Sequence, residues 1–335
     1  MTATIRPEKI LRELDELWVS LGKQENGETS TGVLRACAMT LLVATEGTHD
    51  EADVGETLAS LMRDHPSRAI VLRLLDGAAP DLKARVLAQC WMPFGSRQQI
   101  CCEQIEIGMT EPSLADVPPV LWSLTAPDLP VAMWCRSRRL LALPRFAPLV
   151  GLASKIIIDS AGVADLGDQL GLINTIRIQG PRVGDLAWTR LTRWRESIAQ
   201  IFDNPVYLAR LSALDHVRVG WEGEHVPMSA LYLSAWINHC LGRNVPASFH
   251  REGSCERARV QSVALTGDNL NVSITVGQDR AMELHAGVRD AHSVFPSLTD
   301  YQLLREELSI LGRDAIYESV LALVPQSAQS LETPL

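Results

Sequence analysis

The 335-residue sequence contains none of the short motifs that mark common catalytic and nucleotide-binding sites. It has no GxGxxG or Walker loop for phosphates, no HExxH for zinc, no GxSxG for a serine nucleophile and no CxxC pair. It also lacks any apolar run of about 18 residues, which excludes a helical membrane span, and its charged N-terminus is unlike a secretory signal peptide. We therefore expect a cytoplasmic protein that uses none of these familiar catalytic or phosphate-binding motifs.

The chain also has fewer basic than acidic residues, 31 against 40, which gives a formal net charge of −9. Binding to nucleic acid without sequence preference requires clustered Lys and Arg, so we expect no nucleic-acid partner and no membrane partner. A local arginine cluster at Arg136, Arg138 and Arg139 is suited to a phosphorylated metabolite or an acidic protein face. The histidines lack zinc-site spacing, so we expect no metal and no cofactor. Seven scattered cysteines are typical of reduced thiols.

The first part of the chain alternates apolar runs with helical segments, which is typical of an α/β sheet. The runs at 69–75 and 155–159 have the composition of strands buried on both faces. In contrast, residues 102–109 alternate apolar and polar side chains, which predicts a strand with one face in water. After the first strand, residues 44–56 read ATEGTHDEADVGE, an acidic turn that would repel a pyrophosphate. We predict a mixed α/β sheet domain that is Rossmann-like without a glycine-rich loop.

The later part of the chain has a different pattern of apolar and polar residues. Alternating segments separated by turns predict an antiparallel meander at 257–265, 270–276 and 281–286. A helix is predicted before it at 228–241, and two more after it, at 299–311 and 314–324. The length fits two domains. We predict an N-terminal helix with a polar linker at 1–31, the α/β domain at 32–205, an α+β domain at 206–325 and a frayed tail at 326–335.

The most pronounced helical pattern covers residues 184–203, which read GDLAWTRLTRWRESIAQIFD. Apolar side chains that include Trp188 and Trp194 recur at helical spacing, so one face of this segment should be buried. Arg195 falls on the same face. Breaking a buried ion pair costs about 3–5 kcal/mol, so Arg195 should meet a carboxylate, a bound anion or another chain.

Two shorter constellations also contain candidate functional residues. His65, Ser67 and Arg68 form a turn that leads into a central strand, and this turn is either a binding edge or a structural feature. In the structural alternative, His65 interacts with a helix dipole and Arg68 forms an internal pair. Cys101 and Cys102 are adjacent in a strand, so one thiol should be buried and the other exposed and redox-active. The alternative is that these cysteines act as small buried hydrophobes.

Six segments of the chain together resemble the OpcA family of glucose-6-phosphate dehydrogenase assembly proteins. In order, they are HPSRAI at 65–70, CCEQI at 101–105, PDLPVAMW at 127–134, IIIDSA at 156–161, DLAWTRLTRWRESIAQIFD at 185–203, and LGRDAIYESVL near the end. The resemblance implies a protein without catalysis of its own that binds glucose-6-phosphate dehydrogenase and promotes its assembly or activity in the oxidative pentose phosphate pathway. It also implies a thioredoxin-type redox partner, although the family's cysteines do not map onto this chain.

The leading hypothesis is therefore a non-catalytic allosteric activator of the dehydrogenase. Exposed tryptophans and arginines of the 184–203 segment, among them Trp188, Arg190, Trp194 and Arg195, are its candidate interface anchors. The alternative is an α/β sensor or enzyme that binds a phosphorylated sugar or nucleotide through Arg68, Arg190 and Arg195. A thiol switch at Cys101 and Cys102 is a third hypothesis.

Overall fold

The chain forms two compact units in the computed structural model, and each unit is assembled from separate stretches of sequence. The structure describes residues 5–23, 32–47, 51–91, 98–162, 165–255, 258–287 and 289–332. Unit 1 comprises Met1–Ile158, Gly171–Gly184 and Asp300–Gly312, and unit 2 comprises Asp159–Leu170, Asp185–Thr299 and Arg313–Leu335. The boundary predicted near residue 205 lies inside unit 2.

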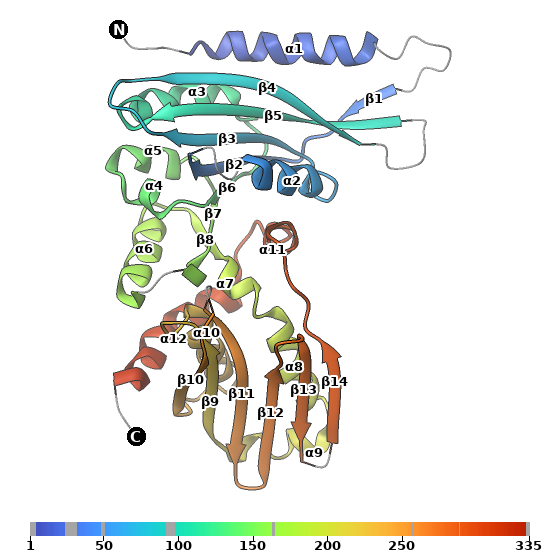
Figure 1. Ribbon diagram of the computed structural model, residues 1–335, viewed down its shortest axis with the longest axis vertical. Helices are drawn as coiled ribbons and strands as arrows, with labels where there is room; N and C mark the ends of the chain where they lie inside the picture. Colours follow the sequence, from blue (N-terminus) through green and yellow to red (C-terminus); the bar gives the residue numbers. More distant parts are fainter. Residues whose placement is uncertain are drawn as a thin grey trace. The chain divides into compact units, whose positions relative to one another are not determined.

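Unit 1 is built on a mostly parallel sheet (Figure 1). Its strands are β1 (Gly32–Arg35), β2 (Met39–Glu46), β3 (Ser67–Leu75), β4 (Leu82–Trp91), β5 (Gln98–Thr110), β6 (Val131–Cys135), β7 (Lys155–Ile158) and β8 (Arg182–Asp185). The order is β1-β5-β3-β2-β6-β7-β8, and β4 pairs antiparallel with β5. The central strands β2, β3, β6 and β7 pair in parallel and are almost entirely buried, which confirms the predicted α/β class.

Helices connect these strands, and α1 packs against β4 (Figure 1). The helices of unit 1 are α1 (Pro7–Lys23), α2 (Glu51–Leu61), α3 (Val117–Leu124), α4 (Arg138–Ala142), α5 (Ala147–Val150) and α11 (Asp300–Leu308), together with the part of α6 (Leu166–Ile178) from Gly171 onward. The predicted polar linker lies largely outside the described residues, since α1 ends at Lys23 and the description resumes at Gly32.

A buried lysine ties the late α11 segment into unit 1. Lys155 of β7 is 2% exposed, and its Nζ lies 2.6 Å from Glu307 Oε1. The same ammonium donates to the carbonyls of Glu307, at 2.9 Å, and Ile310, at 2.7 Å. Gly184 leaves room for this pair, because a Cβ there would overlap Glu307 Oε1. The ammonium is thus fully paired, as a buried charge requires.

Unit 2 contains a second sheet, ordered β10-β9-β11-β12-β13-β14, in which only β9 and β10 pair in parallel. Its strands are β9 (Leu214–Glu222), β10 (Ala247–Gly253), β11 (Arg259–Gly267), β12 (Leu270–Val276), β13 (Ala281–Ala286) and β14 (Arg289–Val294). Its helices are α7 (Leu186–Thr189), α8 (Thr192–Phe202), α9 (Pro205–Leu208), α10 (Met228–Leu241) and α12 (Ala315–Glu332). The predicted meander is confirmed as β11 to β13, and α10 has the predicted bounds.

The segment predicted as one long helix is divided in the structure. Asp185 ends β8 and caps α7 by accepting from the Ala187 amide at 2.9 Å, and α8 starts only at Thr192. The single-helix prediction is therefore wrong at its start, because the Asp185 side chain satisfies the backbone amide of a separate short helix.

The C-terminal helix extends further than predicted. Residues 326–332 belong to α12, and Ser327 is 4% exposed, with its Oγ 3.5 Å from the Ser234 hydroxyl of α10. The prediction of a frayed tail is wrong for these residues, because α12 packs along α10 within unit 2. Within the described ranges, no helix has both the length and the apolar character needed to cross a membrane.

Candidate functional site

In the unit 1 sheet, β2 and β6 are neighbours, and the chain leaves their carboxyl ends toward opposite edges of the sheet. Ligands of doubly wound sheets bind at such a switch point. Here Glu46, at the end of β2, accepts hydrogen bonds from the Ser137 hydroxyl and from Arg139. Arg136, which follows β6, pairs with Asp53 of α2 at 2.8 Å. Carboxylates and their paired arginines thus line this edge, whereas residues 48–50 of the turn lie outside the described residues.

His65, Ser67 and Arg68 make internal contacts within unit 1. His65 Nε2 lies 2.9 Å from the carbonyl of Arg305, to which it donates when that nitrogen carries the proton. Ser67 is completely buried at the start of β3. Arg68 donates to Glu103 at 2.6 Å and to the Leu124 carbonyl at 2.5 Å. This geometry corresponds to the structural alternative rather than to an open binding edge.

Glu103 is the buried centre of an ion cluster in unit 1. Its side chain is 3% exposed and lies 2.6 Å from both Arg35 and Arg68. Trp18 of α1 donates its indole N–H to the same carboxylate at 2.7 Å. The prediction that this stretch of β5 has one face in water is therefore wrong at Glu103, because α1 contributes a partner to that face.

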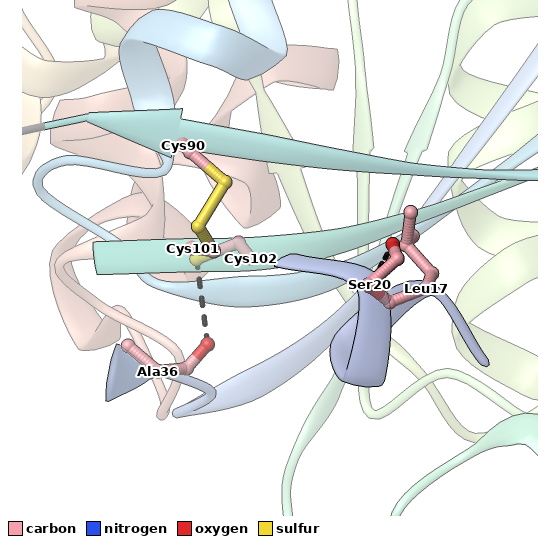
Figure 2. The surroundings of a disulfide bond; sticks show 6 residues. All are labelled: Leu17, Ser20, Ala36, Cys90, Cys101 and Cys102. Carbon is pink, nitrogen blue, oxygen red and sulfur yellow. Dashed lines mark hydrogen bonds between the residues drawn. A yellow bond between two sulfur atoms is a disulfide. The ribbon is translucent and has the colours of Figure 1, made fainter. Parts of the chain in front are cut away.

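Cys101 and Cys102 are both fully buried in β5, which corrects the expectation that one thiol is exposed. Cys101 forms a disulfide with Cys90, its direct partner in the antiparallel β4–β5 register (Figure 2). The expectation of reduced thiols is thus wrong for Cys90 and Cys101. The two residues become neighbours through the register of β4 against β5, which the spacing of the cysteines along the chain does not show. Cys102 Sγ lies 3.3 Å from the Ala36 carbonyl, and burial raises the pKa of its thiol to about 11. A redox role in this region would rest on Cys90 and Cys101.

The tryptophans of the 185–203 segment are buried in unit 2. Trp188 and Trp194 are each 2% exposed, so the interpretation of exposed interface anchors is wrong for both. The ring centroid of Trp188 lies 6.1 Å from that of Tyr232 and 5.6 Å from that of Tyr317. These aromatic side chains form part of the unit 2 core.

Arg195 lies against the ring of Trp188. Its guanidinium carbon is 3.7 Å from the ring centroid, and its Nη2 donates to the Thr192 hydroxyl at 2.8 Å. An arginine over an indole face is a cation–π interaction. The charge within the apolar stripe therefore has an aromatic partner, which is a kind of partner that the sequence did not suggest.

Asp185 lies at the centre of a buried hydrogen-bond network in unit 2. Its carboxylate accepts from the backbone amides of Ser160, at 3.0 Å, and Ala187, at 2.9 Å, and from the Tyr232 hydroxyl at 2.8 Å. Burial removes water from the charged form and raises the pKa of Asp185 to about 6. The same desolvation raises the pKa of Tyr232 well above its ordinary value.

Replacing Asp185 with asparagine is expected to change the pH dependence of stability. Between about pH 4 and pH 6 the folded protein retains a proton that the unfolded chain has released, so this group's contribution to the unfolding free energy falls as pH rises. The stability of Asp185→Asn relative to the parent should therefore rise by about 3 kcal/mol across that window. Urea unfolding at several pH values measures this difference in unfolding free energy between variant and parent. A pH-independent difference, or an equal trend for Asp215→Asn at an exposed site, would contradict the raised pKa.

A cavity of about 250 Å³ lies wholly within unit 2. Of the residues predicted from sequence, Arg190 and Trp194 line it. The other polar and aromatic lining residues include four that the sequence patterns did not single out, namely Arg259, Gln261, Arg280 and Phe295. They come from separate strands and turns that only the fold brings together. The one local signal was the turn between the predicted strands at 270–276 and 281–286, in which Arg280 takes a left-handed conformation with a φ of 64°.

The two units together define a two-part α/β protein with a Rossmann-like parallel sheet followed by a mostly antiparallel sheet. Similar solved structures include biliverdin reductase with biliverdin and NADP+ from Synechocystis, with a TM-score of 0.48 and 10% identity over 87% of this chain and 98% of that chain. A dehydrogenase from Chromobacterium violaceum has a TM-score of 0.44 and 9% identity over 87% of this chain and 94% of that chain.

Family models for the glucose-6-phosphate dehydrogenase subunit match most of the chain, the N-terminal domain model at residues 59–174 and the C-terminal domain model at residues 181–321. The chain belongs to the OpcA family. It is 27% identical over 300 residues to the OxPP cycle protein OpcA of Nostoc punctiforme, which covers 77% of this chain and 64% of the relative. The Synechocystis protein of the same name is 23% identical over 314 residues, covering 81% and 65%. The chain thus spans about two thirds of these relatives' length.

Proposed function

We propose that the chain is a non-catalytic partner that binds glucose-6-phosphate dehydrogenase and promotes its activity in the oxidative pentose phosphate pathway. The match to both domains of a family described as a dehydrogenase subunit carries this proposal. The names of the relatives, which refer to the OxPP cycle, support the pathway. The acidic switch point of unit 1 supports the absence of dinucleotide chemistry, because Glu46 occupies the edge where a phosphate would bind.

The proposed mechanism is a shift in the dehydrogenase's conformational population. A partner that binds the active conformation more tightly than the inactive one raises the fraction of active enzyme. The effect is limited by the difference between the two affinities. Coupling of about 1–3 kcal/mol changes substrate affinity roughly 5- to 150-fold.

Trp122 of α3 is the residue that we propose as a docking anchor. It is 69% exposed, whereas the other seven tryptophans are buried or half-buried. Tryptophan is enriched among the residues that dominate binding energy at protein interfaces. An indole held in water on a helix thus fits a surface that is covered in a complex.

Adding the protein to its cognate dehydrogenase is expected to lower the apparent Michaelis constant for glucose 6-phosphate about 5- to 150-fold. The two proteins should also co-elute in size-exclusion chromatography. Trp122→Ala should weaken the complex at least about tenfold, whereas Ile178→Ala, which removes an 86% exposed side chain from α6, should not. Absence of both a complex and a kinetic change would refute the function, and equal effects of the two variants would refute the anchor.

A further inference from the structure

The unit 2 cavity has the composition of a small-molecule site. Its wall is mainly apolar and aromatic and includes Leu191, Trp194, Val260 and Phe295. The Trp194 and Phe295 ring centroids lie 5.5 Å apart, and the rings are inclined at 53°. A few polar side chains interrupt this wall, as in sites where hydrophobic surface supplies contact and polar groups set orientation. A volume of about 250 Å³ suits a small metabolite rather than a dinucleotide.

A buried hydrogen-bond acceptor lies in the cavity wall without a protein partner. Gln261 is 8% exposed, and its Nε2 donates to the Val276 carbonyl, whereas its Oε1 is buried and has no hydrogen-bond donor among the described residues. The β9–β11 register shifts between Val260 and Ser262, so Gln261 is the extra residue of a β-bulge. Bulges re-aim side chains beside functional sites. A buried acceptor without a donor is costly, so a ligand that donates a hydrogen bond would satisfy it.

The arginines of the cavity differ in their pairing. Arg190 makes two hydrogen bonds to Asp159, at 2.7 and 2.8 Å, and Arg259 pairs with Glu222 at 2.9 Å. For Arg280, in contrast, the described part of the chain offers no side-chain hydrogen bond or ion pair. The nearby carboxylate of Asp279 accepts instead from the Ala281 amide at 3.0 Å. The Arg280 guanidinium therefore remains available to an anion.

The backbone holds Arg280 in place at the cavity. Its φ of 64° is the left-handed conformation that commonly closes a three-residue hairpin loop, here the loop between Gly277 and Ala281. The Arg280 amide donates to the Gly277 carbonyl at 3.0 Å, and the Phe295 amide donates to the Arg280 carbonyl at 2.8 Å. These bonds fix the backbone of Arg280 within the β12–β13 turn, next to Phe295 of the cavity wall.

From these contacts we infer that the cavity binds a small hydroxylated organic anion. Arg280 binds its phosphate or carboxylate group, and Gln261 Oε1 accepts a hydrogen bond from one of its hydroxyls. Trp194 and Phe295 contact its apolar surface. This site is a property of unit 2 alone, so it does not depend on binding to the dehydrogenase, and its test uses the isolated full-length protein.

Isothermal titration calorimetry with four probes tests the site. Glucose 6-phosphate carries hydroxyls and a phosphate, gluconate carries hydroxyls and a carboxylate, glucose lacks the anion, and inorganic phosphate lacks the carbon skeleton. At least one of the first two should bind with a Kd of about 1 mM or lower. Whichever of these two probes binds more tightly shows whether the site prefers a phosphate or a carboxylate group. Glucose and inorganic phosphate should each bind at least about tenfold more weakly.

Variants assign the binding to these residues. Arg280→Gln should weaken binding of the better probe about tenfold or more, and Gln261→Met about threefold or more. Arg218→Gln makes the same charge change at an exposed position on β9 and should leave binding unchanged. Thermal unfolding confirms that each variant is folded, and Arg280→Gln, at an exposed turn, provides a test even if Gln261→Met is destabilised. No binding of either hydroxylated anion at about 10 mM, or equal losses for Arg280→Gln and Arg218→Gln, would overturn the inference.

Discussion

Replacing Trp188 with alanine is expected to lower the free energy of unfolding of unit 2 by about 3–5 kcal/mol. The indole is 2% exposed and packs against Tyr232 and Tyr317, so its removal leaves a cavity in the core. The change also removes the aromatic face that supports Arg195, and the hydrogen bond from Nε1 to Asp314 at 3.4 Å. Urea unfolding followed by circular dichroism measures the loss. Hydrogen exchange over residues 185–203 assigns it to unit 2.

A matched control for this change is Trp122→Ala. It deletes the same side chain from a position that is 69% exposed, so it should cost less than about 1 kcal/mol. Similar losses for the two variants would mean that burial of Trp188 does not contribute to stability as its packing implies. Trp188→Phe retains most of the apolar volume and should give an intermediate loss.

Glu103→Ala is expected to destabilise unit 1 by about 3–5 kcal/mol, because it removes one member of a buried ion cluster and leaves the others without their partner. Arg68 is 12% exposed at its side chain, so its charge would lose the carboxylate in a place with little water. Trp18 would lose the acceptor of its indole N–H, so α1 should also separate from the sheet more readily. Urea unfolding measures the first effect, and the rate of limited proteolysis within α1 measures the second.

The exposed pair of Asp81 and Lys83 provides the comparison for Glu103. Its side chains are 43% and 76% exposed, so Asp81→Ala should change stability by no more than about 1 kcal/mol. If Glu103→Ala cost no more than Asp81→Ala and left the proteolysis of α1 unchanged, the cluster would not be a stabilising feature of unit 1.

The parts of the fold that the sequence predicted well are those with strong local signals. Continuous apolar residues predicted β7, and alternation interrupted by turn residues predicted β11 to β13. The apolar pattern of 228–241 predicted α10 to its last residue, and Gly242 ends the helix with a left-handed φ of 63°. In each case the interactions that determine the element lie within a few residues of one another.

The sequence failed where distant segments determine the environment. The disulfide of Cys90 depends on the register of β4 against β5, and the burial of Glu103 depends on a helix about eighty residues earlier. Residues of the unit 2 cavity, such as Gln261 and Arg280, share no motif because six separate segments supply its lining. Arg190 and Trp194 were identified through the helical pattern and the family resemblance, which point to a segment but not to the surface that it lines.

The interleaving of the two units has a consequence for how the chain is made. Residues 300–312, which complete unit 1 through Glu307 and Lys155, leave the ribosome only after nearly all of unit 2 has been synthesised. Domains commonly fold one after another during translation. Here unit 1 cannot complete its fold until residues 300–312 are available, and until then Lys155 lacks its partner Glu307. A nascent chain arrested before residue 300 should therefore be more sensitive to protease in residues 5–158 than the released protein. Truncation at residue 205 would leave neither unit whole.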